Sequence, residues 1–131
     1  MEISKEEMQV LRKAQQGELD AVLMYNALAK AVKDPQDAET FRRLAAEEGC
    51  HAAVVKGYTN ETLQPKKTMA FFLPKLYKIL GRKKLYPLIA RGEYNAVKSY
   101  EPVARRFPEV ESVKGDEKRH GDTVMALLGN Q

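Results

Sequence analysis

The sequence of 131 residues contains a single cysteine, Cys50, and this scarcity excludes two classes of structure. One chain cannot form an internal disulfide bond, and it cannot build a metal site from cysteine ligands alone. No run of about 18 uncharged apolar residues occurs, so the sequence predicts no membrane-spanning helix. Residues 1–7 lack the basic start and apolar core of a signal peptide, and we therefore expect a cytoplasmic protein.

Alternation of apolar and polar residues, the pattern typical of strands, is also absent. Ala, Leu, Glu, Lys and Arg dominate instead, and they favour helix. The chain carries 22 Lys and Arg against 18 Asp and Glu, and its net charge of +4 is typical of a folded globular protein rather than a disordered one. Its length predicts one domain over residues 1–131.

Helical periodicity predicts four long helices, over residues 4–32, 35–58, 83–107 and 108–129. Ser4 and Glu7 have the spacing of a capping box, and Asp34 before Pro35 has the form of a helix start. The connecting segment 60–82 contains a predicted short amphipathic helix over residues 69–80, ended by Gly81. We expect bends at Pro87 and Pro102. This order predicts an all-α, ferritin-like four-helix bundle whose long crossover carries a short extra helix.

An internal repeat relates the two halves of the chain. The pattern G-E-x-x-A-V-x-x-Y occurs at residues 17–25 and again at residues 92–100. A second pattern, an acidic residue followed by Glu-x-x-His, occurs at residues 47–51 and 116–120, and it contains both histidines of the chain. Repetition of both patterns at matching places makes the signal far more specific than one Glu-x-x-His alone.

The repeated residues form a ligand set for metal ions. Glu and His three positions apart lie on one face of a helix, about one turn apart. In a bundle the inward groups become Glu18, Glu48, His51, Glu93, Glu117 and His120. Buried carboxylates are costly unless a cation offsets their charge. One Glu from each of two helices, with Glu-x-x-His from each of the other two, is the ligand set of di-iron and di-manganese bundles, and we expect a dinuclear site.

On these motifs the chain resembles the rubrerythrin and ferritin-like di-iron superfamily over essentially its whole length. The resemblance implies two iron ions, with manganese or zinc as alternatives, bridged by Glu48 and Glu117. It implies Glu18 and Glu93 as terminal ligands and one histidine on each metal. Tyr25 and Tyr100 match tyrosines whose hydroxyls bond ligand carboxylates beside the metals. We expect Tyr25 to pair with Glu117 and Tyr100 with Glu48.

The resemblance also implies an activity, with two departures. It implies an oxidoreductase whose reduced centre reacts with hydrogen peroxide or dioxygen, in defence against oxidative stress or in iron oxidation. The sequence has no four-cysteine rubredoxin-like region, so we expect electrons from an external rubredoxin-like donor. Ala96 stands where rubrerythrins carry an additional ligand glutamate, which puts the rubrerythrin type of peroxidase reaction in question. The alternatives are a ferroxidase that binds and stores iron, and a bundle that holds metal without catalysis.

Several other residues have simpler interpretations. Glu47 and Asp116 lie off the inner face, so we expect them to be solvated or bonded to the far nitrogen of a histidine. Cys50 is interpreted as a small buried or packing residue, and Tyr94 as a packing residue. The basic segment with aromatic residues between Lys66 and Lys84 is interpreted as a cover for the bundle and a homodimer contact, rather than a site for nucleic acid or a membrane.

Overall fold

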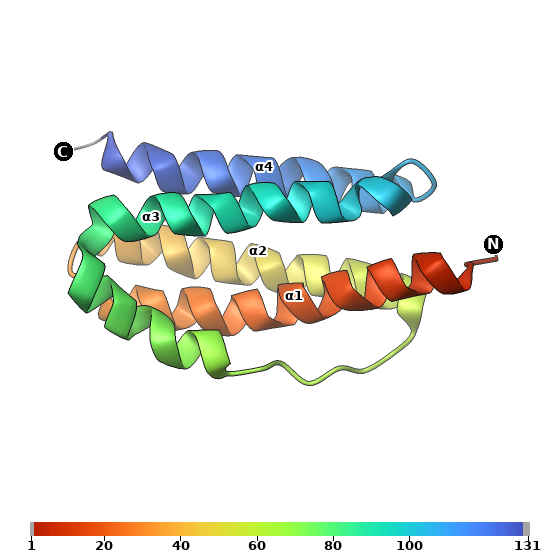
Figure 1. Ribbon diagram of the computed structural model, residues 1–131, viewed down its shortest axis with the longest axis horizontal. Coiled ribbons are helices and arrows are strands. Elements are labelled where there is room, and N and C mark those ends of the chain that lie inside the picture. Colours follow the sequence, from red (N-terminus) through yellow and green to blue (C-terminus); the bar gives the residue numbers. More distant parts are fainter. Residues whose placement is uncertain (1, 130–131) are drawn as a thin grey trace.

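The computed structural model describes residues 2–129 as four helices packed in a bundle (Figure 1). They are α1 (Lys5–Ala31), α2 (Pro35–Thr59), α3 (Thr68–Ala104) and α4 (Pro108–Leu128). Helix α1 packs against α2 and α3, and α4 packs against α3 and α2, so α1 and α4 stand at diagonal corners. This arrangement confirms the predicted all-α, ferritin-like four-helix bundle.

Local side-chain contacts explain where the first two helices begin. Ser4 accepts a hydrogen bond from the Glu7 backbone at 3.0 Å, and the Glu7 carboxylate accepts one from the Ser4 backbone at 2.9 Å. Asp34 caps α2 by accepting from the backbone of Gln36 at 2.7 Å, with Pro35 as the first helical residue. Both predicted starts are therefore confirmed, because these caps depend only on neighbouring residues.

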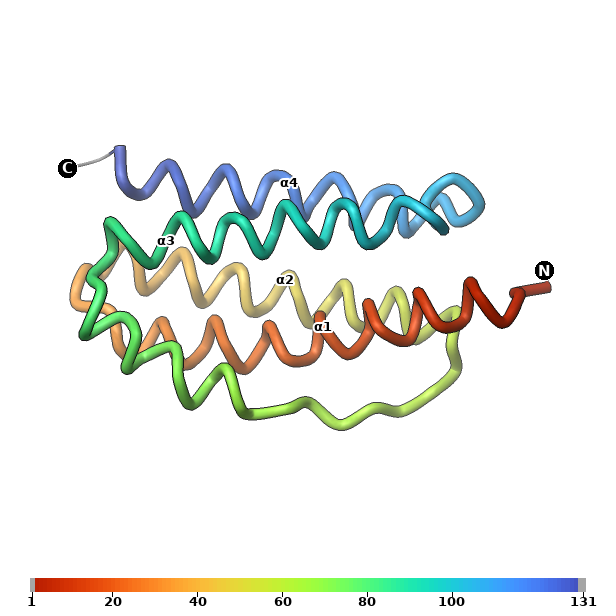
Figure 2. Tube along the Cα trace, in the orientation of Figure 1, coloured from red at the N-terminus to blue at the C-terminus, as the bar shows by residue number. Residues whose placement is uncertain are grey.

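The crossover differs from the expectation. Residues 60–67 contain no helix and run back along the bundle, as the uncoiled yellow-green part of the trace shows (Figure 2). The expected short helix over residues 69–80 is not separate, because α3 continues from Thr68 to Ala104 through a kink at Gly81. Gly81 has φ of 74°, a value that glycine adopts at little cost. Within α3 only Gly81 leaves helical angles, so Pro87 and Pro102 remain helical, and α3 ends three residues before the expected Phe107.

Two apolar clusters fill the bundle on either side of its middle. One cluster includes Leu28, Phe41 and Tyr86, and the other includes Leu11, Val55 and Phe107. Buried carboxylates and histidines occupy the stretch of each helix between these clusters. Both clusters therefore hold the helices in the register that brings these polar groups together. None of the described helices is both long and apolar enough to cross a lipid bilayer.

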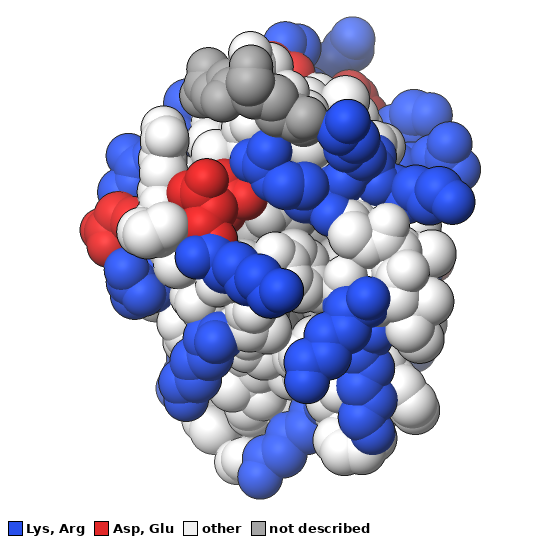
Figure 3. All heavy atoms as spheres, turned by 90° about the vertical axis from the view of Figure 1, so that its left-hand side faces the viewer, with Lys and Arg blue, Asp and Glu red and all other residues white. Residues whose placement is uncertain are grey.

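The first part of α3 covers the bundle with one face only. Leu73 is buried in the core, whereas Phe71, Phe72 and Ile79 are exposed. Lys and Arg side chains dominate the end of the molecule at which α1 passes into α2 and α3 kinks (Figure 3). The segment therefore does cover the core, as expected from its amphipathic pattern, and it also leaves apolar side chains on the surface.

Candidate metal centre

Six side chains from the four helices meet in the middle of the bundle, and all of them are buried. Helix α1 supplies one glutamate, α3 supplies another, and α2 and α4 each supply a glutamate and a histidine one turn apart. They are Glu18, Glu48, His51, Glu93, Glu117 and His120. The structure thus brings together every residue of the predicted ligand set.

The inner nitrogen of His51 faces three carboxylate oxygens. Its Nδ1 atom lies 3.1 Å from Glu18 Oε2, 3.1 Å from Glu48 Oε1 and 3.0 Å from Glu117 Oε1. The three oxygens come from α1, α2 and α4. One glutamate is thus from the first helix, and the other two belong to the Glu-x-x-His motifs.

The inner nitrogen of His120 has the corresponding surroundings. Its Nδ1 atom lies 3.1 Å from Glu48 Oε1, 3.3 Å from Glu93 Oε2 and 3.5 Å from Glu117 Oε1. Glu48 and Glu117 are therefore common to both histidines, whereas Glu93 lies beside His120 and is replaced by Glu18 beside His51. Potential ligand atoms of the two Glu-His pairs all lie within 4.8 Å of one another.

The outer nitrogens of both histidines contact acidic residues of the opposite helix. His51 Nε2 lies 2.9 Å from Asp116 Oδ2, and His120 Nε2 lies 3.0 Å from Glu47 Oε1. An ionised carboxylate only accepts hydrogen bonds, so each Nε2 carries the proton. This leaves Nδ1 as the nitrogen that can bind a metal ion. The expectation that Glu47 and Asp116 bond to the far nitrogens is confirmed.

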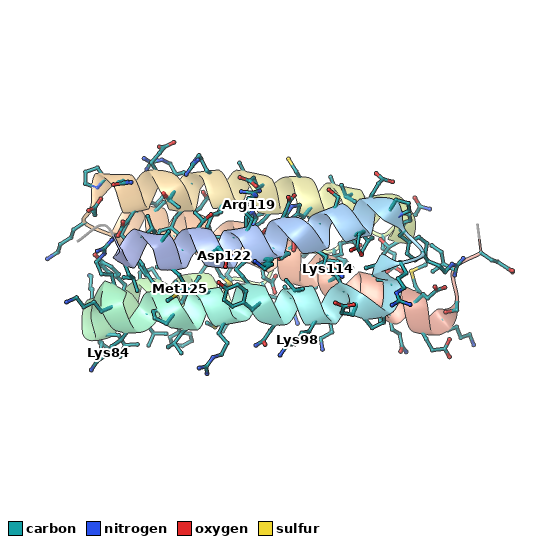
Figure 4. All side chains as sticks on the ribbon, turned by 90° about the horizontal axis from the view of Figure 1, so that it is seen from above. Lys84, Lys98, Lys114, Arg119, Asp122 and Met125 are labelled. Carbon is teal, nitrogen blue, oxygen red and sulfur yellow. The ribbon has the colours of Figure 1, made fainter. Side chains whose placement is uncertain are left out.

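Arg119 joins these two acidic residues, a role that the sequence analysis did not predict. Its guanidinium donates a hydrogen bond to Glu47 and lies 3.6 Å from Asp116. Seen from above, Arg119 lies on the side of α4 that faces α2, while Asp122 lies on the side toward α3 (Figure 4). The position directly before His120 is the only signal in the sequence for this contact.

The pKa values of the carboxylates and histidines at the centre are shifted from their usual values. Burial raises the pKa of Glu18 and Glu93, and the hydrogen bonds to His51 and His120 offset only part of that rise. Burial alone would lower the pKa of His120, but the carboxylates of Glu48, Glu93 and Glu47 outweigh it and raise the pKa to about 11. The protein interior at this point therefore favours positive charge, supplied by protons or by metal ions.

Unpaired atoms indicate that metal ions fit better than protons. Glu93 Oε2, Glu117 Oε1 and His120 Nδ1 are buried and have no hydrogen-bond partner, although they lie close to one another. Buried polar atoms are rarely left in this state. His51 Nδ1 is within hydrogen-bond distance of Glu18 and Glu48, and the other converging atoms remain unpaired. Four carboxylates and two imidazole nitrogens in this arrangement fit a pair of divalent cations, and carboxylate with imidazole suits iron and manganese.

The tyrosines do not pair as expected. Tyr25 donates its hydroxyl hydrogen to Glu93 Oε1 at 2.8 Å, so its expected pairing with Glu117 is wrong. The physical reason is that α1 contacts α3, whereas α4 is the diagonal helix. The hydroxyl of Tyr100 is buried and has no partner, so the expected bond to Glu48 is absent as well. Burial, followed by the charges of Glu18, Glu117 and Glu48 and by the contact of the hydroxyl with Glu18, raises the Tyr100 pKa.

Of two further residues near the centre, one departs from its expected environment and the other matches it. Cys50 is exposed, so its interpretation as a buried or packing residue is wrong. Tyr94 packs as expected, because its ring lies so close to Gly121 that an added Cβ would be 2.5 Å away. Its hydroxyl donates to Asp122 at 2.6 Å, on the outer side of α4. Neither residue contributes an atom to the carboxylate cluster.

Comparison with known proteins identifies a protein family. The family model described as Rubrerythrin matches residues 9–128, which is nearly the whole chain and includes all six residues of the centre. Among curated proteins and among solved structures, nothing matches this chain.

Proposed function

The chain belongs to the rubrerythrin family, and from this premise we propose that it is a non-haem di-iron oxidoreductase whose reduced centre reacts with hydrogen peroxide or dioxygen. One observation carries the proposal. Both histidine Nδ1 atoms face the same two glutamates, Glu48 and Glu117, while each has one further glutamate of its own. We propose that the single domain over residues 1–131 is built around this arrangement.

The contacts support a division of roles among the ligands. Glu48 and Glu117 would bridge the two metal ions, because each lies beside both histidines. Glu18 with His51 would complete one metal site, and Glu93 with His120 the other. Four carboxylates balance the charge of two divalent ions, provided that both histidines are neutral. When bound, two reduced iron ions supply the two electrons that a peroxide needs for cleavage of its O–O bond.

The surrounding side chains keep these ligands in place. Glu47 and Asp116 hold the Nε2 protons, so that each Nδ1 lone pair points inward. The Tyr25 hydroxyl donates its proton to Glu93 Oε1, with 2.8 Å between the two oxygens, and so fixes that carboxylate. The Tyr100 hydroxyl lies beside the Glu18 carboxylate but makes no well-aligned hydrogen bond, and it can donate one to an oxygen atom that enters the centre.

Two partners belong to this proposal. An external one-electron donor, such as a rubredoxin-like protein, would return the electrons that peroxide removes. A second copy of the chain would contact the exposed apolar side chains at the start of α3, where Phe71 and Phe72 are 60% and 48% exposed. Such side chains are enriched in protein interfaces.

The test is to load the protein with iron, reduce it, and follow its re-oxidation by absorbance. We expect two irons per chain and faster re-oxidation by hydrogen peroxide than by dioxygen. The variant that combines Glu48→Ala with Glu117→Ala should lose both irons, since the bridge is removed from both sites. Glu39→Ala is the matched control, because Glu39 lies on the surface of α2 and pairs only with Arg42.

Three outcomes would contradict the proposal. Retention of two irons by the double variant would show that these glutamates do not bridge. Oxidation of many added Fe(II) ions per site would favour an iron-storage ferroxidase. Redox-silent zinc in protein from its native cells, with no reaction toward either oxidant, would favour a metal-binding bundle without catalysis.

A further inference from the structure

A cleft of about 680 Å³ opens between α1 and α3 and reaches the carboxylates of the centre. Its walls are mainly apolar, with Leu76 and Ile89 among them, and its mouth lies beside Met69 and Leu88, which are 44% and 51% exposed. At the inner end it reaches Glu18, Glu48, Glu93 and Glu117. A cleft of this volume is typical of sites for small organic ligands, whereas hydrogen peroxide occupies only about the space of two water molecules, roughly 60 Å³.

The internal repeat itself makes this cleft. In each copy of G-E-x-x-A-V-x-x-Y the Gly, the Glu, the Ala and the Tyr line it: Gly17, Glu18, Ala21 and Tyr25 in α1, and Gly92, Glu93, Ala96 and Tyr100 in α3. A Cβ added at Gly17 or Gly92 would meet no other atom within 4 Å. Close packing of the helices therefore does not require these glycines, and small residues line the cleft on both of its helices.

One polar group at the inner end has no partner in the protein. Tyr100 lines the cleft and is only 2% exposed, and its hydroxyl, although it lies beside the Glu18 carboxylate, makes no well-aligned hydrogen bond. Its repeat counterpart Tyr25 lines the same cleft but already donates to Glu93. Because an unpaired buried hydroxyl costs free energy, the Tyr100 hydroxyl is suited to an oxygen atom of a ligand.

We propose that this cleft binds alkyl hydroperoxides, with the apolar chain along the α1–α3 walls and the peroxide oxygens between Tyr100 and the carboxylates. This inference rests on the proposed function, because it names a substrate class for the same centre. The apolar walls favour a carbon chain, the free hydroxyl favours an oxygen function at its end, and the carboxylates place that function beside the metal ligands.

The reaction balances without a further reagent. The O–O bond of ROOH breaks, two electrons come from the reduced iron pair, and two protons are taken up from water. The products are ROH and one water molecule. The Tyr100 hydroxyl acts only as a hydrogen-bond donor that positions the peroxide, and it returns unchanged.

The first experiment compares two oxidants on the same reduced, iron-loaded protein. The rate constant for re-oxidation by cumene hydroperoxide is divided by that for hydrogen peroxide. We expect Ala96→Phe, which adds a ring inside the cleft, to lower this ratio at least tenfold. Gly92→Leu is the second variant in case the first fails to fold, since nothing lies within 4 Å of its added Cβ.

Ala126→Phe is the matched control, because Ala126 lies on the exposed side of α4 and does not line the cleft. Its ratio should equal that of the unmodified protein. An unchanged ratio in both cleft variants would overturn the inference while leaving the proposed function intact. A loss of reaction with both peroxides in the unmodified protein would instead count against the proposed function.

The second experiment needs no turnover. Binding of 1-decanol to the iron-loaded, oxidised protein is measured by titration calorimetry, since an alcohol has the chain and oxygen of the product. We expect one molecule per chain, with affinity at least tenfold weaker in Ala96→Phe and unchanged in Ala126→Phe. Absence of saturable binding would overturn the inference. A dimer that becomes monomeric in Ala96→Phe would do the same, because a second copy would then cover the cleft.

Discussion

The two halves of the bundle supply matching carboxylates and histidines to the centre, but they differ in the residues around them. Glu18 and Glu93 correspond across the repeat, as do His51 and His120, and their positions at the centre are equivalent. The tyrosines also correspond in sequence, yet Tyr25 has a hydrogen-bond partner and Tyr100 has none. The positions of the four carboxylates depend on one another, because their charges must be balanced together. The hydrogen bonding of each neighbouring side chain depends only on the atoms that it contacts.

The contacts to the outer nitrogens of the histidines show the same contrast. Asp116 and Glu47 have equivalent roles, but Glu47 alone receives a hydrogen bond from Arg119. Loss of such a carboxylate lowers metal affinity by about 10- to 100-fold in comparable sites. We expect a loss of this size in Glu47→Ala and in Asp116→Ala, measured with Mn(II) against a competing chelator.

The Glu39→Ala variant is again the control for a carboxylate removed from the outside of α2. Equal losses in Glu47→Ala and Asp116→Ala would show that the histidine contact carries the effect, since only Glu47 bonds to Arg119. Unchanged affinity in both variants would contradict the role of these carboxylates in orienting the imidazoles.

The two halves also differ in how a side chain of the first repeat pattern packs against the helix that carries Glu-x-x-His. Tyr94 lies against Gly121 in the second half, and the repeat offsets of 75 and 69 residues place Leu19 and Ala52 at the same positions in the first half. In the second half the large Tyr94 packs against a glycine. In the first half the smaller Leu19 corresponds to Tyr94, and Ala52 corresponds to Gly121. Gly121→Ala should lower the free energy of unfolding by about 2 kcal/mol, because its Cβ would lie 2.5 Å from the Tyr94 ring.

Chemical denaturation measures this loss. Adding Tyr94→Leu to Gly121→Ala should recover most of the stability, since the pair then matches Leu19 and Ala52. Gly115→Ala is the control, because nothing lies within 4 Å of its added Cβ and alanine favours helix. A stable Gly121→Ala protein with no recovery on the second substitution would contradict the packing account.

The smallest predicted effect concerns the tyrosines. Tyr25→Phe leaves Glu93 Oε1 without its hydrogen-bond donor and should cost about 1 kcal/mol of unfolding free energy in the metal-free protein. Tyr100→Phe removes no hydrogen bond, and its cost should be close to zero. Denaturation of both variants under the same conditions compares them directly. An equal cost would mean that Tyr100 has an acceptor in the folded protein.

Sequence periodicity predicted which buried polar residues meet at the centre, because an α-helix turns by a fixed angle per residue. Glu48 and His51 had to share a face, and the repeat placed Glu117 and His120 in the same way. The tyrosine pairings were wrong because they depend on which helices are diagonal, and periodicity within one helix carries no such information. The sequence predicts that Gly81 ends a helix, whereas in the structure Gly81 kinks α3. A glycine with positive φ can either end a helix or kink it.

The exposure of Cys50 and the cleft between α1 and α3 depend on packing across the bundle. Cys50 lies two residues from Glu48, and the angle between them excludes the centre but does not distinguish a buried from a solvent-exposed position. The small residues Gly17 and Ala96 were visible in the repeat. Their shared cleft could not be predicted, because it requires knowing that α1 and α3 lie side by side.

Anomalous diffraction from a crystal of the iron-loaded protein, measured at the iron absorption edge, tests the central claim most directly. The account predicts two peaks per chain, one beside Nδ1 of His51 and one beside Nδ1 of His120, with Glu48 and Glu117 bound to both. A single peak, or two peaks that do not share these glutamates, would contradict it.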